Sequence, residues 1–235
     1  MANAILMASG MGTRMAPLTI TKPKPLIEVN GKSMIETIIE ALENIQIDNI
    51  YVVVGYLAEQ FNYLPDKYKN VVLVKNPDYK KVNNISSIYY AAQHLKENDC
   101  YICESDLYVS DKDILNRVLT DSGYFGKMKK GFSDDWVFDL DKHGYISRVG
   151  MKGHDCYNMV GLSYFTKEDA AILAAVIQEA YGKNGYEALF WDDVVNNNLD
   201  KLKLRIHPVQ DNQIIEIDTV EELNKVNQEI LNGNR

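Results

Sequence analysis

The first chemically informative segment combines glycines with two cations near the N-terminus. The run Ala8-Ser9-Gly10-Met11-Gly12-Thr13-Arg14 directly follows the apolar stretch 4–7. A glycine loop after a buried strand brings backbone N–H groups close to a phosphate, and a Cβ would block that approach. Lys24 follows between two prolines, which fix the backbone around it. We therefore predict a phosphate site in which the loop, Arg14 and Lys24 bind an anion.

Two common phosphate-binding motifs are excluded at this loop. No Gly-Lys-Ser/Thr sequence ends it, so it is not a P-loop. Met15 and Ala16 stand where a dinucleotide-binding fingerprint needs its third glycine, which disfavours an oxidoreductase. The glycine pair alone is also compatible with a tight turn, and we expect Lys22 and Lys32 to be solvated.

Acidic residues that could hold a divalent cation follow two predicted strands. Asp106 comes after the strand 101–103, and Asp218 lies between the strand 214–217 and the helix 219–231. Ligands of parallel sheets bind at the carboxyl ends of the strands, and Mg²⁺ is held by one or two carboxylates together with phosphates and waters. Asp106 is therefore a candidate metal ligand, whereas Asp218 is compatible with metal binding or with a helix cap.

Strands and helices alternate along the first half of the chain, which predicts parallel βαβ units. Expected strands here are 4–7, 50–54, 71–74 and 101–103, and expected helices start at Ser33 and cover 57–63 and 85–95. After about residue 122 the expected strands are 123–128, 136–140, 145–149, 160–165, 202–206 and 214–217, with helices 166–181 and 219–231. The predicted fold is a Rossmann-like three-layer α/β/α arrangement with a mostly parallel mixed sheet.

Composition disfavours several classes of protein. The 235 residues carry 33 acidic and 25 basic side chains, for a net charge of -8, which disfavours a nucleic-acid-binding surface. No apolar run approaches the ~18 residues of a membrane-spanning helix, and the N-terminus lacks the basic start of a signal peptide. Cys100 and Cys103 are three apart in a strand and should point to opposite faces as buried thiols. We expect a cytoplasmic protein without membrane insertion.

The loop and the residues after it resemble a known family signature. Ala8-x-Gly10-x-Gly12-Thr13-Arg14, Pro17-Leu18-Thr19 and Pro23-Lys24 are similar to the opening motif of the nucleoside-triphosphate transferases that make nucleotide sugars and CDP-alcohols. Further matches make the chain most similar to the bacterial choline-phosphate cytidylyltransferases; they are Val54-Gly55-Tyr56, Asn83-Asn84 with Ser87 and Tyr89, Trp136, Phe190-Trp191-Asp192 and Glu216-Ile217-Asp218. Ser9 departs from the resemblance, because the family usually has alanine or glycine there.

The resemblance implies roles for the residues of the site. Lys24 and Arg14 would be the catalytic cations that neutralise the triphosphate of CTP, and Asp106 and Asp218 would hold Mg²⁺. The residues implied in nucleotide binding are Ala8, Ser9, Gly10, Met11, Gly12, Thr13, Gly55, Tyr56, Asn84 and Ser87. An Asn or Ser side chain can pair with the polar edge of cytosine, although Asn84 and Ser87 are also compatible with a turn and a helix cap.

Aromatic and acidic residues in the second half suit a cationic acceptor. A quaternary ammonium donates no N–H hydrogen bond and prefers aromatic faces and negative charge. The chain has two tryptophans, Trp136 and Trp191, and Asp192 follows the second. We expect these three residues to bind phosphocholine, although a tryptophan is also common in a core. The same pocket could hold the primary ammonium of phosphoethanolamine or 2-aminoethylphosphonate.

The expected reaction joins CTP and phosphocholine to give CDP-choline and pyrophosphate. The acceptor oxygen is already anionic, so positioning and charge neutralisation are sufficient and no general base is needed. A sugar-1-phosphate nucleotidyltransferase and a non-catalytic nucleotide sensor are the alternatives; retention of both cations and Asp106 disfavours the sensor. We expect one domain over 1–235, with a nucleotide-binding part at about 1–120 and an acceptor-binding part at about 121–235. The oligomeric state is not predicted.

Overall fold

The apolar run near the N-terminus forms the central strand of the sheet. In this computed structural model, which describes residues 2–233, β1 (Ala2–Ala8) pairs in parallel with β4 (Asn49–Val54) and with β6 (Asp99–Glu104). Its side chains alternate between two hydrophobic clusters, with Ile5 in one and Leu6 in the other. Burial on both faces explains why this strand is continuously apolar.

Seven strands form one sheet in the order β10-β8-β9-β6-β1-β4-β5. The four not yet introduced are β5 (Val71–Lys75), β8 (Gly123–Leu140), β9 (Ile146–Phe165) and β10 (Arg205–Pro208). β9 is antiparallel to both of its neighbours, and every other adjacent pair is parallel. This arrangement confirms the predicted mostly parallel mixed sheet, and strands from both halves of the chain share it.

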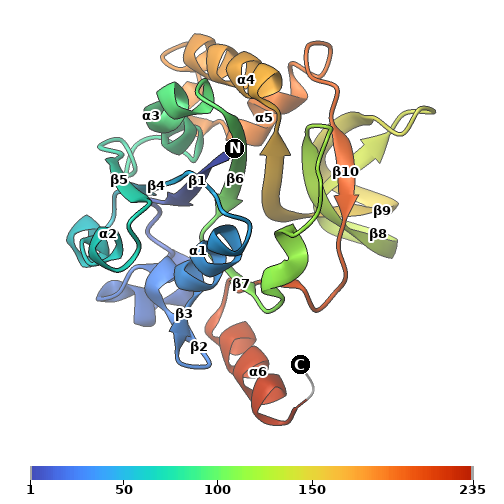
Figure 1. Cartoon of the computed structure of the whole chain (residues 1–235). Helices are drawn as coiled ribbons and strands as arrows, with labels where there is room; N and C mark the ends of the chain where they lie inside the picture. Colours follow the sequence, from blue (N-terminus) through green and yellow to red (C-terminus); the bar gives the residue numbers. More distant parts are fainter. Residues whose placement is uncertain (1, 234–235) are drawn as a thin grey trace.

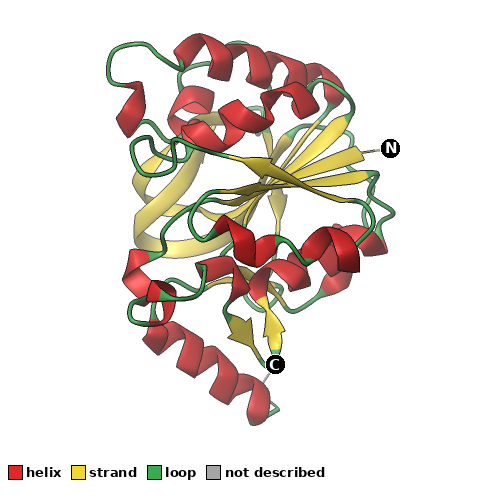
Figure 2. Ribbon diagram, turned by 90° about the vertical axis from the view of Figure 1, so that its left-hand side faces the viewer, coloured by secondary structure: helices red, strands yellow, loops and turns green. Residues whose placement is uncertain are grey.

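Helices cover both faces of the sheet, which completes the predicted three layers (Figure 2). One face packs against α1 (Met34–Asn44) and α2 (Leu64–Lys67). The other face packs against α3 (Ile85–Leu95), α4 (Lys167–Ala180) and α5 (Trp191–Asn196). The last helix, α6 (Val220–Leu231), lies at the lower end of the molecule in Figure 1 and packs in a third, smaller cluster.

The second half differs most from the expected elements. Four expected strands between 123 and 165 are two long, bent strands, β8 and β9, whose pairing is interrupted by register shifts. Val137 pairs with both Gly150 and Asn158, so the hairpin folds back on itself. The expected helix 57–63 is a 3-10 turn at Ala58–Phe61 that leads into α2. Local patterns miss such features because tertiary pairing decides where a strand bends.

Two short antiparallel pairs lie outside the main sheet. β2 (Glu28–Val29) pairs with β3 (Lys32–Ser33), and β7 (Leu107–Val109) pairs with β11 (Ile214–Glu216). Of these four strands, the sequence predicted β11. The β7–β11 pair matters most, because it joins the segment after β6 to the segment before α6.

The cysteine expectation is confirmed. Cys100 and Cys103 both lie in β6, and they belong to hydrophobic clusters on opposite faces of the sheet. Both are free thiols, and burial raises the pKa of each above its usual value. They therefore behave as small apolar core residues. Among residues 2–233, no helix has the length and apolar character needed to cross a bilayer.

We predict that Gly123→Ala destabilises the fold where β8 meets β10. A Cβ at Gly123 would lie 2.1 Å from the backbone oxygen of Arg205. Because backbone must shift to admit it, the free energy of unfolding should fall by about 2 kcal/mol in chemical denaturation. Gly150→Ala is the control, since its Cβ would meet only the flexible end of the Arg148 side chain. Equal stability of the two variants would contradict this explanation.

Candidate active site

A cavity of about 600 Å³ lies at the carboxyl ends of β1 and β6. It is lined by the glycine loop, by the loop and helix start that follow β5, by acidic residues after β6 and β11, and by side chains of β8, β9 and α5. Ligands of open α/β sheets bind at this end of the strands. The cavity therefore has the position that the sequence predicted for the phosphate site.

The glycine loop packs tightly against the segment that carries Lys24. Gly12 has a φ of +60°, and a Cβ there would lie 2.7 Å from Cβ of Lys24. The hydroxyl of Thr19 donates to the carbonyl of Gly12 at 2.9 Å. Only glycine allows both this left-handed backbone and this close approach. The loop backbone thereby packs directly against the first side-chain carbons of Lys24.

Lys24 lies between two carboxylates that are distant in sequence. Its Nζ donates to Oδ2 of Asp106 and to Oδ1 of Asp218, each at 2.6 Å, and Arg14 Nη2 lies 2.7 Å from the same Asp218 oxygen. Burial of Lys24 opposes its charge, but attraction and hydrogen bonds from Asp106 and Asp218 outweigh burial and raise its pKa. Lys24 is therefore cationic at neutral pH, as binding of a phosphate requires.

The small β7–β11 pair brings these carboxylates together. Leu107 pairs with Glu216, and the backbone N–H of Ile217 donates to the carbonyl of Asp106 at 3.1 Å. Asp106 and Asp218 flank this pairing on its two strands. Two residues 112 positions apart in the sequence thus reach the same ammonium.

The acidic residues fit a hard divalent cation. Asp106 Oδ1 is buried and has no hydrogen-bond partner among the described residues. One carboxylate oxygen from each of Glu104, Asp106 and Glu216 lies within 4.8 Å of the others. Oxygen donors of this kind are what Mg²⁺ prefers. Burial, followed by the charge of Asp106, raises the pKa of Glu216 to about 8, so a bound cation would also stabilise its ionised form.

Two of these acidic residues, Glu104 and Glu216, were not among the metal ligands expected from the sequence. We expected Asp106 and Asp218 as ligands, whereas the cluster around Asp106 contains Glu104 and Glu216. Glu104 ends β6 only two residues before Asp106, and Glu216 ends β11 only two residues before Asp218. The signal available in the sequence was a second acidic residue two positions before each expected ligand, at the end of the preceding strand. Asp218 itself lies at the cavity and shares Lys24 with Asp106.

Most of the residues expected to bind the nucleotide line the cavity. They are Ala8, Ser9, Gly10, Gly12, Thr13, Asn84 and Ser87. Ser9 and Ser87 are 2.9 Å apart through their hydroxyls, and both contact the side chain of Asn76. Asn84 accepts the backbone N–H of Trp191 through Oδ1 at 2.9 Å, which links this end of the cavity to α5.

Three expected nucleotide residues lie outside the cavity lining. Met11 lies within the glycine loop and is exposed. The Tyr56 hydroxyl donates to the carbonyls of Thr19 and Ile20, so it supports the segment after the loop. A Cβ at Gly55 would lie 2.7 Å from the Tyr79 ring. The absence of a side chain at Gly55 therefore leaves room for Tyr79, which lines the cavity. Tyr56 and Gly55 thus support neighbouring segments in the free protein, and a nucleotide contact at these three positions stays a prediction.

Trp136 and Asp192 also line the cavity. Trp136 meets Phe190 edge to face, with ring centroids 5.4 Å apart. Asp192 is 2% exposed and accepts the Tyr124 hydroxyl at 3.0 Å. Burial raises the pKa of Asp192 to about 7 against the opposing effect of that hydrogen bond. A buried carboxylate beside aromatic rings is suited to an organic cation.

The structure corrects the expectation for Trp191. Its indole is 3% exposed, stacks on Tyr124 and does not line the cavity. Its position as the first residue of α5 turns the side chain into the core, whereas the neighbours Phe190 and Asp192 reach the cavity. Phe190 lines the cavity where Trp191 was expected. The sequence analysis included Phe190 only as part of the Phe190-Trp191-Asp192 motif.

Comparisons with known proteins agree with this geometry. The chain is 55% identical to the 2-aminoethylphosphonate cytidylyltransferase of Lancefieldella rimae, over 94% of this chain and 90% of the relative. It is 32% identical to the choline-phosphate cytidylyltransferase of Streptococcus pneumoniae, over 98% and 99% of the two chains. A solved structure of the CTP:phosphocholine cytidylyltransferase from Streptococcus pneumoniae superposes with a TM-score of 0.87, 31% identity and coverage of 97% and 99%.

The family match covers the part of the chain that contains the glycine loop, Lys24 and Asp106. Residues 4–126 match the profile described as the MobA-like NTP transferase domain. That region spans β1 to the start of β8 and carries most of the phosphate end of the cavity. The chain therefore belongs to the family of MobA-like NTP transferases.

Proposed function

We propose that this protein is a Mg²⁺-dependent cytidylyltransferase that joins CTP to 2-aminoethylphosphonate and releases pyrophosphate. The observation that supports this proposal most strongly is the 55% identity, over 94% of the chain, to a relative named 2-aminoethylphosphonate cytidylyltransferase. The sequence alone favoured phosphocholine. The relatives named for choline phosphate are less similar, at 32% and 28% identity, so we revise the acceptor to the primary amine.

The cationic and acidic groups of the cavity support phosphoryl chemistry. A phosphonate oxygen of the acceptor would attack the α-phosphorus of CTP, forming a P–O–P bond while the bond to the β-phosphate breaks. Lys24 would neutralise the α-phosphate, and Arg14 with the backbone of the glycine loop would hold the departing pyrophosphate. Mg²⁺ held by Asp106 and Asp218, with Glu216 nearby, would add positive charge there. The attacking oxygen is already an anion and needs no base.

The acceptor end suits a primary ammonium. Asp192 can accept a hydrogen bond from an N–H donor, which a quaternary ammonium lacks. With Trp191 in the core, Trp136 and Phe190 line the cavity as an edge-to-face pair, and Tyr79 is the third aromatic residue of the lining among the described residues. The rings of Trp136 and Phe190 with the Asp192 carboxylate form an incomplete aromatic cage for a quaternary ammonium. The same three groups suit a small primary ammonium, which can donate a hydrogen bond to Asp192.

Phosphocholine is the second candidate acceptor. The Trp136–Phe190 pair presents aromatic surface to a cation, and the relatives at 31–32% identity cover nearly the whole chain. In both acceptors two carbons join an anionic phosphorus group to a positive nitrogen, but phosphocholine has an ester oxygen between phosphorus and carbon. The acceptors also differ in N–H donors and in the volume of the nitrogen substituents.

The first prediction of the proposed function concerns the acceptor. Pyrophosphate release from CTP should show the highest kcat/KM with 2-aminoethylphosphonate, at least about tenfold above phosphocholine, because one charge-assisted hydrogen bond is lost with the quaternary amine. Phosphoethanolamine and a sugar 1-phosphate complete the panel. Higher efficiency with phosphocholine would return the acceptor to choline, and CTP binding without turnover of any acceptor would point to a nucleotide sensor.

The second prediction concerns Lys24. Lys24→Met should reduce kcat by about 10²–10³, because the substitution keeps the aliphatic stem and removes the cation that faces the transferring phosphate. Lys22→Met is the matched control, since Lys22 is exposed and pairs with Glu28 on the same segment. Steady-state rates and thermal melting of both variants are compared. Wild-type turnover in Lys24→Met would contradict the assigned role.

The third prediction concerns Asp192 and pH. Below a pKa of about 7 this carboxyl is protonated and cannot pair with an ammonium, so kcat/KM for the acceptor should rise as pH increases from about 6 to 8. Asp192→Asn should lower kcat/KM and flatten that rise, with CTP held saturating. Asp200→Asn, an exposed change on the loop after α5, serves as the control. An unchanged slope in Asp192→Asn would exclude this carboxyl as the titrating group.

A further inference from the structure

A buried tyrosine behind the cavity wall contacts the carboxylate of Asp192. Tyr124 lies in β8, is 1% exposed and is not among the residues that line the cavity. Its hydroxyl donates to Oδ1 of Asp192 at 3.0 Å. Because Asp192 does line the cavity, this hydrogen bond joins a core side chain to a group that a ligand can reach.

Aromatic packing fixes the ring of Tyr124. The ring stacks on Trp191 with centroids 5.6 Å apart, and it also packs against Phe138 at 4.9 Å and Phe165 at 6.2 Å. Trp191 is the residue directly before Asp192, so the stack also positions the start of α5. None of these contacts needs the hydroxyl, which therefore can be removed while the ring stays in place.

The surroundings of Asp192 hold no cation that pairs with it among the described residues. The charged neighbours that act on it or feel its charge are both acids, Asp193 on α5 and Glu104 at the end of β6. Asp193 accepts the backbone N–H of Phe190 at the start of the helix. Burial favours the protonated form of Asp192, and the strongest opposing effect is the hydrogen bond from Tyr124, followed by its own backbone N–H.

The Tyr124 hydroxyl remains a donor while Asp192 titrates. Burial, followed by the charge of Asp192, raises the pKa of Tyr124 well above its usual value, so the phenol keeps its proton. A donor fixed on Oδ1 favours the carboxylate over the carboxylic acid. The other oxygen, Oδ2, accepts no side-chain hydrogen bond from the described residues. Asp192 therefore keeps hydrogen-bonding capacity for a ligand.

We propose that Tyr124 is a positioning residue for the acceptor, because its hydroxyl holds the Asp192 carboxylate ionised and in place for the acceptor's ammonium. The inference rests on the proposed function, in which Asp192 meets that ammonium. A lysine or arginine in place of the hydroxyl would also favour the carboxylate, but it would occupy the group and repel a second cation. A neutral donor favours the negative charge and leaves it available.

Tyr124→Phe tests this inference, because it keeps the ring and removes the donor. The pKa of Asp192, about 7 in the wild type, should rise. With CTP saturating, the midpoint of the rise in acceptor kcat/KM should move to higher pH by about one pH unit. The variant should then be about fivefold less efficient at pH 7 and within about twofold of the wild type at pH 9. A purely structural role would lower kcat/KM by the same factor at every pH, which would overturn the inference.

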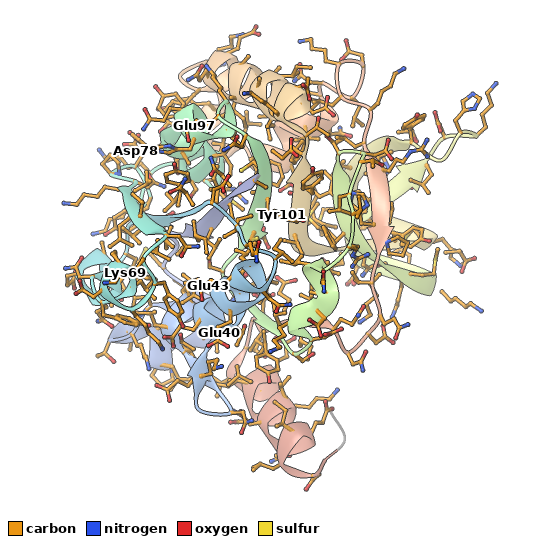
Figure 3. All side chains as sticks on the ribbon, in the orientation of Figure 1. Glu40, Glu43, Lys69, Asp78, Glu97 and Tyr101 are labelled. Atoms are coloured by element: carbon orange, nitrogen blue, oxygen red, sulfur yellow. The ribbon has the colours of Figure 1, made fainter. Side chains whose placement is uncertain are left out.

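Tyr164→Phe is the matched control. Tyr164 is also buried, and its hydroxyl donates to Oδ2 of Asp99 at 2.8 Å, but it lies in β9 outside the cavity lining. Its ring packs against Tyr101, which Figure 3 labels near the centre of the view, with centroids 5.1 Å apart. Loss of this hydroxyl should leave the midpoint of the pH profile unchanged even if the melting temperature falls.

The double variant Asp192→Asn with Tyr124→Phe shows whether Tyr124 acts through Asp192. In the Asp192→Asn background, Tyr124→Phe should cause no further shift of the pH profile, because the titrating carboxyl is gone. The ionisations of the acceptor itself are the same in every assay, so they cancel when two variants are compared. A shift of the profile that persists in the Asp192→Asn background would overturn the inference.

A titration without catalysis separates this inference from the proposed function. NMR of ¹³C-labelled aspartate carboxyls follows the ionisation of Asp192, whose signal is the one lost in Asp192→Asn. A higher midpoint in Tyr124→Phe supports the inference, and equal midpoints overturn it. If the wild type releases pyrophosphate from CTP but Tyr124→Phe keeps the wild-type pH profile, the function stands and the role of Tyr124 fails. If the wild type uses no acceptor, the proposed function fails, and the NMR titration still decides whether Tyr124 sets the ionisation of Asp192.

Discussion

The contact of Lys24 with Asp106 and Asp218 is the interaction on which the site depends. One ammonium satisfies two carboxylates that would otherwise repel each other in a half-buried space. Each partner belongs to a different part of the chain, and the β7–β11 pair brings Asp106 and Asp218 together. A triphosphate would compete with the two carboxylates for Lys24, and a divalent cation would compete with Lys24 for the carboxylates.

The shared sheet places two chemically different halves around one cavity. The parallel strands β6, β1 and β5 end near Asp106, at the glycine loop and at Asn76. β9 reverses direction beside β6, and the long hairpin that it forms with β8 brings Trp136 to the cavity lining. The hydrogen bond from the backbone N–H of Trp191 to Asn84 joins the start of α5 directly to the residue before α3.

Much of the phosphate end could be predicted because its signals are local. Gly12 needs a left-handed backbone, Lys24 lies between prolines, and Asp106 follows a buried strand. The acceptor end was harder to predict, because adjacent residues at the start of α5 point in different directions. Trp191 was expected in the pocket and lies in the core, whereas Phe190 reaches the pocket. Which of two neighbouring aromatics faces a cavity depends on how the helix docks, and local spacing does not encode that rotation.

The sequence by itself determined the alternation of strands and helices, the glycine loop and the cations that follow it, since each rests on backbone geometry or on periodicity within a few residues. Only the tertiary structure decided that Glu104 and Glu216 lie beside Asp106, that Tyr56 supports the loop, and that Asn76 orients Ser9 and Ser87. Most of these relations join residues that are far apart in the sequence, such as Asp106 with Glu216 and Ser9 with Asn76. Their physical basis is mutual hydrogen bonding and charge pairing in a buried space, which exists only once the chain has folded.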